Sequence, residues 1–247
     1  MTLLSVRGAS KQFGAVVGLV DVDVDVDAGE VVALLGDNGA GKSTLIKCLS
    51  GALRLDRGTI AIDDDRVTVH SPAEARALGI ETVYQDLALF DNLRPSDNFY
   101  AGRELASPGW LPRPLRFLRR RAMAATTRST LNRLQIELDD RGVVGLMSGG
   151  QRQAVAVSRA AAFASRIVIL DEPTAALGVR ESRRVLDLIR RLRGDGKAVI
   201  VVSHAMDHVM EVADRAIVMR RGRIVGEVVP SAETYAQIVS LIVGGGS

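Results

Sequence analysis

One stretch of the sequence decides its fold: Gly36-Asp37-Asn38-Gly39-Ala40-Gly41-Lys42-Ser43-Thr44. It matches the pattern G-x-x-x-x-G-K-[ST], in which glycines let backbone N–H groups approach a bound phosphate without a Cβ in the way. Lys42 supplies a positive charge for the β- and γ-phosphates, and the hydroxyl of Ser43 is a ligand for Mg²⁺. The stretch therefore predicts a site for a nucleoside triphosphate and Mg²⁺.

The residues on either side of this loop agree with that prediction. Residues 31–35 form a short apolar run, which is typical of a buried strand. Residues 44–49 can open a helix, whose positive N-terminal end would face the anion. Strand, glycine loop and helix in this order favour a phosphate-binding loop over a chance glycine-rich turn.

Composition and charge narrow the function classes. The chain has 247 residues, of which 47% are hydrophobic and 25% charged, as in ordinary globular proteins. The net charge of +3 is too small to argue for nucleic-acid binding, and the 4% of aromatic residues is too few for a base-stacking platform. No apolar run reaches the roughly 18 residues of a membrane-spanning helix, and we expect no signal peptide. The single cysteine, Cys48, excludes an intrachain disulfide and fits a reducing cytosol.

Hydrophobic periodicity divides the chain into three parts. Strands and helices alternate before residue 86 and after residue 164, whereas residues 86–164 show mostly helical spacing. We expect helical structure over residues 115–138 of this middle part. Apolar β-branched runs at 166–170 and 197–202 predict buried parallel strands, joined by a crossover helix over 180–193 that Gly194 caps.

Local patterns near the N-terminus predict two further features. Residues 59–63 and 67–69 flank Asp64-Asp65-Arg66 and predict a hairpin. Residues 20–27 alternate valine with aspartate, so a strand there would bury the valines and expose the aspartates. A calcium site is the alternative for four aspartates, but their spacing lines them along a strand rather than around an ion.

Two carboxylates, Asp171 and Glu172, follow the apolar run of residues 167–170. A carboxylate at the C-terminal edge of a strand is where an α/β nucleotide site needs its Mg²⁺ partner. Asp171 suits the metal, and Glu172 suits the base that orients or deprotonates the attacking water. The pair is a weak signal alone and a strong one behind a phosphate loop.

Gln85 and His204 also follow predicted strands, at residues 80–84 and 197–202. The carbonyl oxygen of Gln85 can contact Mg²⁺ or hold the attacking water. His204 can hydrogen-bond the γ-phosphate and stabilise developing charge.

A second candidate anion site is the run Ser148-Gly149-Gly150-Gln151, before a predicted helix over 152–163. Taken alone, Ser-Gly-Gly is a common loop. Two γ-phosphate sites in one chain are explained if each site faces a different copy of the chain.

Together these residues resemble the motifs of the ATP-binding cassette (ABC) ATPases, over most of the chain. The family's motifs correspond to residues 36–44 for Walker A, Gln85 for the Q-loop, Met147 to Gln151 for the signature motif, residues 167–172 for Walker B, and His204 for the switch histidine. The resemblance implies an α/β fold with a P-loop NTPase (RecA-like) core, formed by residues 1–85 and 165–247. It further implies an N-terminal antiparallel β subdomain and an inserted helical subdomain over 86–164 that carries the signature motif.

The resemblance also implies how ATP is held. Phe13 stands where the family places an aromatic side chain that stacks on adenine; a core position is the alternative. Two copies would form a head-to-tail homodimer that sandwiches two ATP molecules. Each ATP would lie between the Walker loops of one copy and the signature motif of the other.

Three stretches look most like the cassettes of bacterial monosaccharide importers for ribose, xylose or fructose: residues 36–39, 79–87 and 173–179. That likeness implies an ATPase at the cytoplasmic face of the bacterial inner membrane, which drives sugar uptake through separate permease subunits and, indirectly, a sugar-binding protein. The alternatives are an ABC ATPase of another transport system and a non-transport ABC protein that acts on ribosomes or DNA. The second kind usually has two cassettes, long coiled coils or zinc inserts, which this sequence lacks.

The sequence departs from the family's pattern in two places. Gly178 stands where most cassettes have an aspartate that helps to couple the two ATP sites, and Met147 replaces the usual leucine. A cluster of arginines in the middle part can face anionic lipid or the permease, with a solvated helix face as the alternative. The cluster consists of Arg113, Arg116, Arg119, Arg120 and Arg121.

Overall fold

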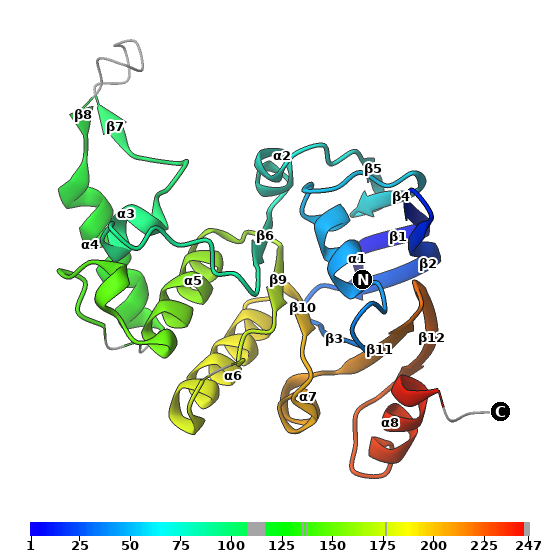
Figure 1. The fold of residues 1–247 in the computed structure, drawn as a ribbon. Helices are drawn as coiled ribbons and strands as arrows, with labels where there is room; N and C mark the ends of the chain where they lie inside the picture. Colours follow the sequence, from blue (N-terminus) through cyan, green and yellow to red (C-terminus); the bar gives the residue numbers. More distant parts are fainter. Residues whose placement is uncertain (108–116, 135, 137, 176, 245–247) are drawn as a thin grey trace.

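A six-stranded sheet forms the centre of the fold, in the strand order β12-β11-β3-β10-β9-β6 (Figure 1). The computed structural model describes residues 1–247 except 108–116, 135, 137, 176 and 245–247. All neighbours in the sheet are parallel except β12, which pairs antiparallel with β11. The strands are β3 (Val31–Leu35), β6 (Ile80–Val83), β9 (Ile167–Asp171), β10 (Ala198–Val202), β11 (Arg215–Arg220) and β12 (Arg223–Val228).

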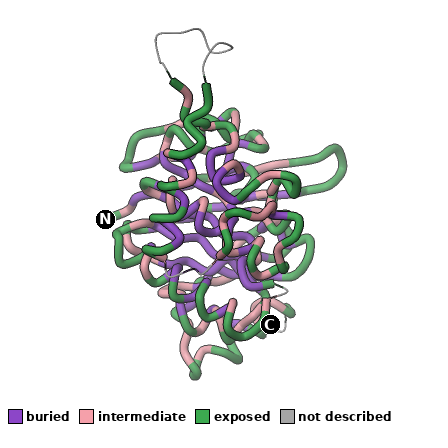
Figure 2. The backbone as a smooth tube through the Cα atoms, turned by 90° about the vertical axis from the view of Figure 1, so that its left-hand side faces the viewer, coloured by how far each residue is buried: buried purple, intermediate pink, exposed green. Residues whose placement is uncertain are grey.

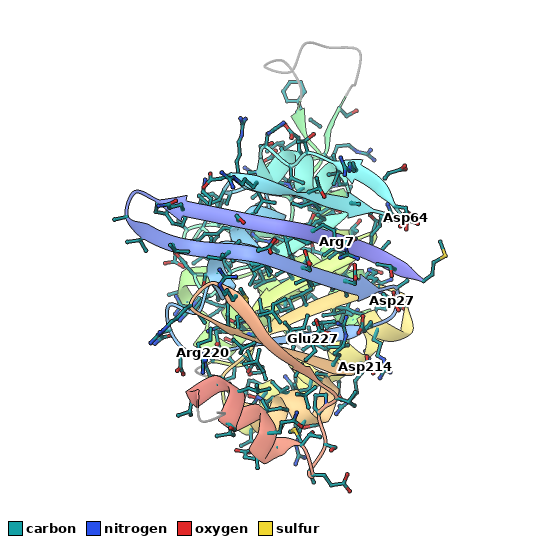
Figure 3. All side chains as sticks on the ribbon, turned by 90° about the vertical axis from the view of Figure 1, so that its right-hand side faces the viewer. Arg7, Asp27, Asp64, Asp214, Arg220 and Glu227 are labelled. Atoms are coloured by element: carbon teal, nitrogen blue, oxygen red, sulfur yellow. The ribbon has the colours of Figure 1, made fainter. Side chains whose placement is uncertain are left out.

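A second, antiparallel sheet has the order β2-β1-β4-β5. Its strands are β1 (Thr2–Phe13), β2 (Val16–Asp27), β4 (Arg57–Ile62) and β5 (Asp65–Val67). The alternation predicted for residues 20–27 is confirmed, because Val22, Val24 and Val26 are buried. The opposite face is polar, and Figure 3 looks onto it, with Arg7 and Asp27 labelled on β1 and β2.

The aspartates of β2 bind groups of β1 rather than converging on an ion. Arg7 donates to Asp25 at 2.7 Å, and the backbone N–H of Gly8 donates to Asp23 at 2.6 Å. Within the part of the chain that the structure describes, no group of three or more His, Cys, Asp and Glu side chains could hold a metal ion. The strand interpretation of these residues is therefore preferred to the calcium alternative.

Each face of the central sheet has its own cover, and the buried residues gather between the layers (Figure 2). Ile167 and Ile169 of β9 pack on the side of α1 (Lys42–Leu49) and the antiparallel sheet. Val168 and Leu170 point the other way, towards α5 (Gly149–Phe163) and α6 (Val179–Gly194). On that second side, α7 (Met206–Val212) and α8 (Tyr235–Val243) cover β3 and β11. Alternate side chains of one buried strand therefore serve two cores.

The middle of the chain is less uniformly helical than predicted. It contains α3 (Pro95–Phe99), α4 (Arg120–Arg133), a 3₁₀ turn (Val144–Leu146) and α5, but also a small ribbon of β7 (Ala106–Ser107) and β8 (Phe117–Leu118). The helix expected over residues 115–138 is therefore wrong at both ends. Phe117 and Leu118 pair with β7 instead. The chain leaves α4 at Leu134 and turns back, so that Ile136 donates to Leu131 O and is buried beside it.

Two predicted boundaries are also corrected. The turn of the β4–β5 hairpin lies at Asp63 and Asp64, whose φ angles of 51° and 66° suit a tight turn, so the second strand begins at Asp65. Gly194 does not cap the crossover helix, because it is the last residue of α6. The left-handed turn comes at Gly196, with φ 76°.

The helix that Ser71 and Glu74 open is α2 (Pro72–Ala77). Ser71 accepts from the backbone N–H of Glu74 at 3.2 Å, and the Glu74 carboxylate accepts from the backbone N–H of His70 at 2.8 Å. The first bond caps the helix at its N-cap residue, and the second holds the residue before the N-cap against the first turn.

None of the helices built from described residues is long and apolar enough to cross a membrane. Arg113 and Arg116 of the predicted arginine cluster lie outside the described residues. The subdomain boundaries at residues 85/86 and 164/165 stay a prediction.

Candidate functional site

A cavity of about 680 Å³ opens where β3, β9 and β10 end. In parallel α/β sheets, ligands bind beyond the carboxyl ends of the strands, because the connecting loops diverge there. Most of the candidate residues predicted from the sequence line this one cavity: Phe13, residues 37–44, Gln85, Asp171, Glu172 and His204.

The glycine loop is pressed against its neighbours, which explains two of its glycines. A Cβ on Gly36 would lie 2.2 Å from the carbonyl oxygen of Met219, and a Cβ on Gly41 would lie 2.7 Å from that of Gly18. Both glycines also have positive φ angles, 140° and 107°. Any other residue would therefore push the loop away from the ends of β11 and β2. Gly36 lies behind the loop and does not line the cavity.

Lys42 is buried, with 6% of the residue exposed. Its ammonium group donates to the carbonyl oxygens of Gly36 at 2.5 Å and Asp37 at 2.9 Å. Burial lowers the pKa of Lys42, and the nearby carboxylates of Glu172 and Asp171 act in the opposite direction. A buried ammonium with exposed loop N–H groups around it favours an anionic ligand, and phosphate is the type that this loop can surround.

Asp171 and Glu172 face Lys42 from the end of β9. Asp171 is 8% exposed, and burial raises its pKa against the opposing effect of Lys42. Burial also raises the pKa of Glu172, while His204 lowers it. Glu172 Oε1 lies 3.2 Å from His204 Nε2, yet no donor is aligned with this buried oxygen. A carboxylate oxygen that no donor satisfies, on a side chain with a raised pKa, is suited to general-base chemistry.

The backbone of Glu172 is also unusual, because its φ angle is 53°. Its N–H donates to Val202 O at 2.9 Å, which continues the β9–β10 pairing by one residue. A left-handed non-glycine residue stores strain and is frequent at functional sites. Nothing in the sequence indicated this conformation.

The oxygens needed for Mg²⁺ are present at the same edge. Ser43 supplies a hydroxyl, Gln85 an amide oxygen and Asp171 a carboxylate, all on the cavity wall. Hard oxygen donors of this kind, completed by phosphate oxygens and water, fit Mg²⁺.

Apolar residues around the β1–β2 turn form another part of the cavity wall. Phe13 is 43% exposed and lines the cavity, so the core alternative for Phe13 is excluded. Val16 and Val17, which the sequence analysis missed, lie on the wall with it and are 67% and 50% exposed. The signal available was a cluster of large apolar side chains around a turn glycine, Gly14.

The second candidate anion site lies apart from this cavity. Ser148, Gly150 and Gln151 line a different cavity of about 170 Å³, together with Leu177 and Glu181. Ser148 Oγ accepts from the Gln151 backbone N–H at 3.2 Å, and Gln151 Oε1 accepts from the Ser148 backbone N–H at 2.9 Å. This capping box fixes the start of α5. Within one copy of the chain, the two candidate phosphate sites therefore do not meet.

Substituting Glu172 by Gln tests the burial of its charge. Because burial raises the pKa of Glu172, the folded chain binds this proton more tightly than the unfolded chain does. The wild type therefore loses stability as pH rises from the ordinary glutamate value of 4.5 through the raised value. Glu172→Gln avoids this loss, so we expect its unfolding free energy to exceed that of wild type at about pH 8 and to converge with it at about pH 4.

Urea unfolding at both pH values, without nucleotide, measures this difference. Glu233→Gln, the same change at an exposed position outside the cavity, is the matched control. A pH-independent effect of Glu172→Gln would contradict the assignment.

Comparison with known proteins agrees with the geometry. The family described as ABC transporter matches residues 19–175. The fructose import ATP-binding protein FrcA of Rhizobium meliloti is 46% identical over 244 residues, which cover 98% of this chain and 94% of that protein. A xylose/arabinose import ATP-binding protein of Sulfolobus acidocaldarius is 46% identical over 90% of this chain and 86% of its own length. A ribose import ATP-binding protein of Rubrobacter xylanophilus is 43% identical over 98% of this chain, but only 47% of that protein is covered.

Among solved structures, a nucleotide-free ATP-binding cassette from an ABC transporter has a TM-score of 0.84 and 26% identity, with 98% of each chain covered. A second cassette, in its ADP conformation, has a TM-score of 0.79. The predicted α/β fold of a P-loop NTPase is thereby confirmed. The chain belongs to the ABC transporter family and is an ATP-binding, ATP-hydrolysing member of it.

Proposed function

We propose that this chain is the ATPase subunit of a sugar importer, and that the cavity at the ends of β3, β9 and β10 is its catalytic site. The observation that carries the proposal is the convergence of Lys42, Asp171, Glu172 and His204 in that cavity. Import of a simple sugar is inferred from the names of the relatives, which are import proteins for fructose, xylose/arabinose and ribose.

The residues take the following roles in binding. The N–H groups of the glycine loop and the ammonium of Lys42 hold the β- and γ-phosphates of ATP. Ser43, Gln85 and Asp171 hold Mg²⁺, which neutralises phosphate charge when bound. Phe13, with Val16 and Val17 beside it, provides an apolar surface on which adenine can stack.

Hydrolysis follows from the same arrangement. Glu172 orients a water molecule and accepts its proton as the water oxygen attacks the γ-phosphorus. The bond from that phosphorus to the bridging oxygen breaks, which gives ADP and inorganic phosphate. His204, 3.2 Å from Glu172, stabilises the charge that develops on the γ-phosphoryl oxygens.

The signature segment at Ser148 completes the site from a second copy. In one chain, Ser148 and Lys42 line separate cavities. The hydroxyl of Ser148 accepts its capping bond and still has a proton to donate, while the adjacent glycine N–H groups sit at the N-terminus of a 15-residue helix. A head-to-tail homodimer would bring this helix to the γ-phosphate of the other copy.

A groove of about 230 Å³ beside β6 is the proposed docking site for the permease. It is lined by Tyr84 and Ala88 on either side of Gln85. Arg159 of α5 donates to the backbone oxygens of Leu87 and Ala88 at 3.4 Å. The segment after Gln85 is thus joined to the helix that begins at the signature motif, which gives a mechanical connection between permease and ATP.

This arrangement implies a peripheral subunit at the cytoplasmic face of the bacterial inner membrane, with permease subunits as direct partners and a sugar-binding protein as an indirect one. A transport system for another substrate is the second candidate. A role on ribosomes or DNA has no supporting feature in the described structure.

Glu172→Gln should abolish turnover and retain ATP. Removing a general base lowers the rate about 10²–10⁴-fold, whereas the phosphate-binding groups are unchanged. Steady-state phosphate release and equilibrium binding of a fluorescent ATP analogue measure the two effects. Glu233→Gln, the same change at an exposed position, should behave as wild type. Normal turnover, or loss of ATP binding, in Glu172→Gln would remove the base role from this residue.

Mixing two inactive variants tests the shared site. We expect Lys42→Ala and Ser148→Arg each to be inactive alone. In a mixture, heterodimers combine the intact Lys42 of one copy with the intact Ser148 of the other, so roughly a quarter of the wild-type sites are restored. Phosphate release should recover on mixing. No recovery would indicate that Lys42 and Ser148 act within one copy.

Transport itself is tested in the source cells. Deleting the chain should abolish energy-dependent uptake of at least one of fructose, ribose, xylose and arabinose, measured with labelled sugars. Wild type should restore this uptake and Glu172→Gln should not. Unchanged uptake of all four, with ATPase activity intact in the purified chain, would contradict sugar import and leave the ATPase assignment in place.

A further inference from the structure

The β7–β8 ribbon and the residue before it carry three exposed apolar side chains. In Figure 1 it stands at the far end of that part, beyond α3 and α4. Phe117 is 77% exposed, Leu118 47% and Leu105 36%. None of these three side chains belongs to a hydrophobic cluster formed by the described residues.

The ribbon offers apolar side chains on both of its faces. Phe117 pairs with Ser107 and Leu118 with Ala106, and consecutive strand residues point to opposite sides. Both of these large side chains are nevertheless exposed. A two-stranded ribbon of this size is marginal in water unless something packs on it. A protein pocket would usually cover one face, whereas the interfacial zone of a bilayer surrounds a narrow ribbon on both.

Three exposed arginines, Arg119, Arg120 and Arg121, directly follow the ribbon. No ion pair joins any of these arginines to a described residue. Among the described residues from 102 to 121, Glu104 is the only acidic one, and it accepts from the Gly102 N–H. The sequence between the two strands, residues 108–116, contains no acidic residue. The local charge is therefore strongly positive.

The placement of these arginines is unfavourable for the helix they begin. Arg119 is the N-cap of α4 without a side-chain capping bond, and the first turn has no acidic residue. The N-terminal end of a helix favours anions and disfavours cations. Residues that disfavour the helix they begin are expected at functional sites, where binding rather than folding determines which residue is present. An external anion at this end would neutralise the arginines and suit the helix dipole together.

The ribbon also begins beside the groove proposed for the permease. Arg103 lines that groove and pairs with the buried Glu81 at 2.8 Å, and Leu105 follows two residues later. The segment that leads into the ribbon therefore also lines the groove.

We propose that the β7–β8 ribbon binds the surface of an anionic bilayer, with Phe117 and Leu118 inserted at the headgroup boundary and Arg119, Arg120 and Arg121 on lipid phosphates. Exposed apolar side chains next to arginines are the combination that binds such interfaces. The orientation relative to the groove rests on the proposed function, but binding to lipid alone does not.

Vesicle flotation of the purified full chain tests this proposal. The probes are vesicles of equal parts phosphatidylcholine and phosphatidylglycerol, and vesicles of phosphatidylcholine alone. We expect binding to the anionic vesicles only, weaker at high salt. Each arginine near an anionic surface contributes about fivefold in affinity, so Arg119→Gln/Arg120→Gln/Arg121→Gln should weaken binding about a hundredfold.

Two further variants separate the contributions. Phe117→Ser/Leu118→Ser should also weaken binding, with the charge unchanged. Arg54→Gln/Arg57→Gln/Arg66→Gln is the charge-matched control, since these arginines are exposed and lie in or beside the β4–β5 hairpin, on the other side of Figure 1. ATP binding by every variant checks that it is folded.

Absence of binding by wild type, or equal loss in the control, would overturn the proposal. If wild type ignores vesicles but the ribbon variants lose sugar uptake in cells, the ribbon contacts the permease rather than lipid. Vesicle binding together with failed sugar uptake would contradict the proposed function and leave the lipid site standing.

Discussion

The buried ammonium of Lys42 is the interaction on which the candidate site depends. The ammonium of a residue that is only 6% exposed needs compensation, and this chain provides it from two directions. Loop carbonyls of Gly36 and Asp37 accept its protons, while Asp171 and Glu172 lower the cost of its charge from the end of β9. The two carboxylates are themselves disfavoured by burial. The ammonium of Lys42 and the N–H groups of the loop therefore favour a negatively charged ligand, so the fold of the loop determines the kind of ligand that binds.

The packing of the central sheet stabilises the fold and so offsets the cost of gathering these charges at one edge. β3, β9 and β10 are wholly buried and β-branched or leucine-rich, so they pack on both faces and hold their ends in register. Parallel pairing then aligns the residues that follow each strand: the glycine loop after β3, Asp171 and Glu172 at β9, and His204 after β10. Chemistry that is scattered over more than 160 residues of sequence thereby meets at one edge.

Much of this could be predicted from sequence, because buried strands and glycine loops have strong local patterns. Residues 31–35 and Val22, Val24 and Val26 of β2 are buried as expected, and the motif residues gather in one cavity apart from Gly36 and the signature segment. The roles of these residues stay predictions. The middle part was less predictable, since β7 and β8 are two residues each and exist only through pairing across residues 108–116. Single-chain patterns cannot show such a pairing, nor the turn of Ile136 back onto Leu131.

The conformation of Glu172 shows why a motif alone does not make a catalytic base. Glu172 directly follows β9, and its Oε1 lies 3.2 Å from His204 Nε2. The φ angle of 53° turns the chain at this residue, while its N–H remains bound to Val202 O of the neighbouring strand. The left-handed region costs a non-glycine residue about 1–2 kcal/mol, which the sheet pairing offsets. Glycine would adopt the turn without strain but has no carboxylate, so the strain follows directly from needing both the turn and the base at one position.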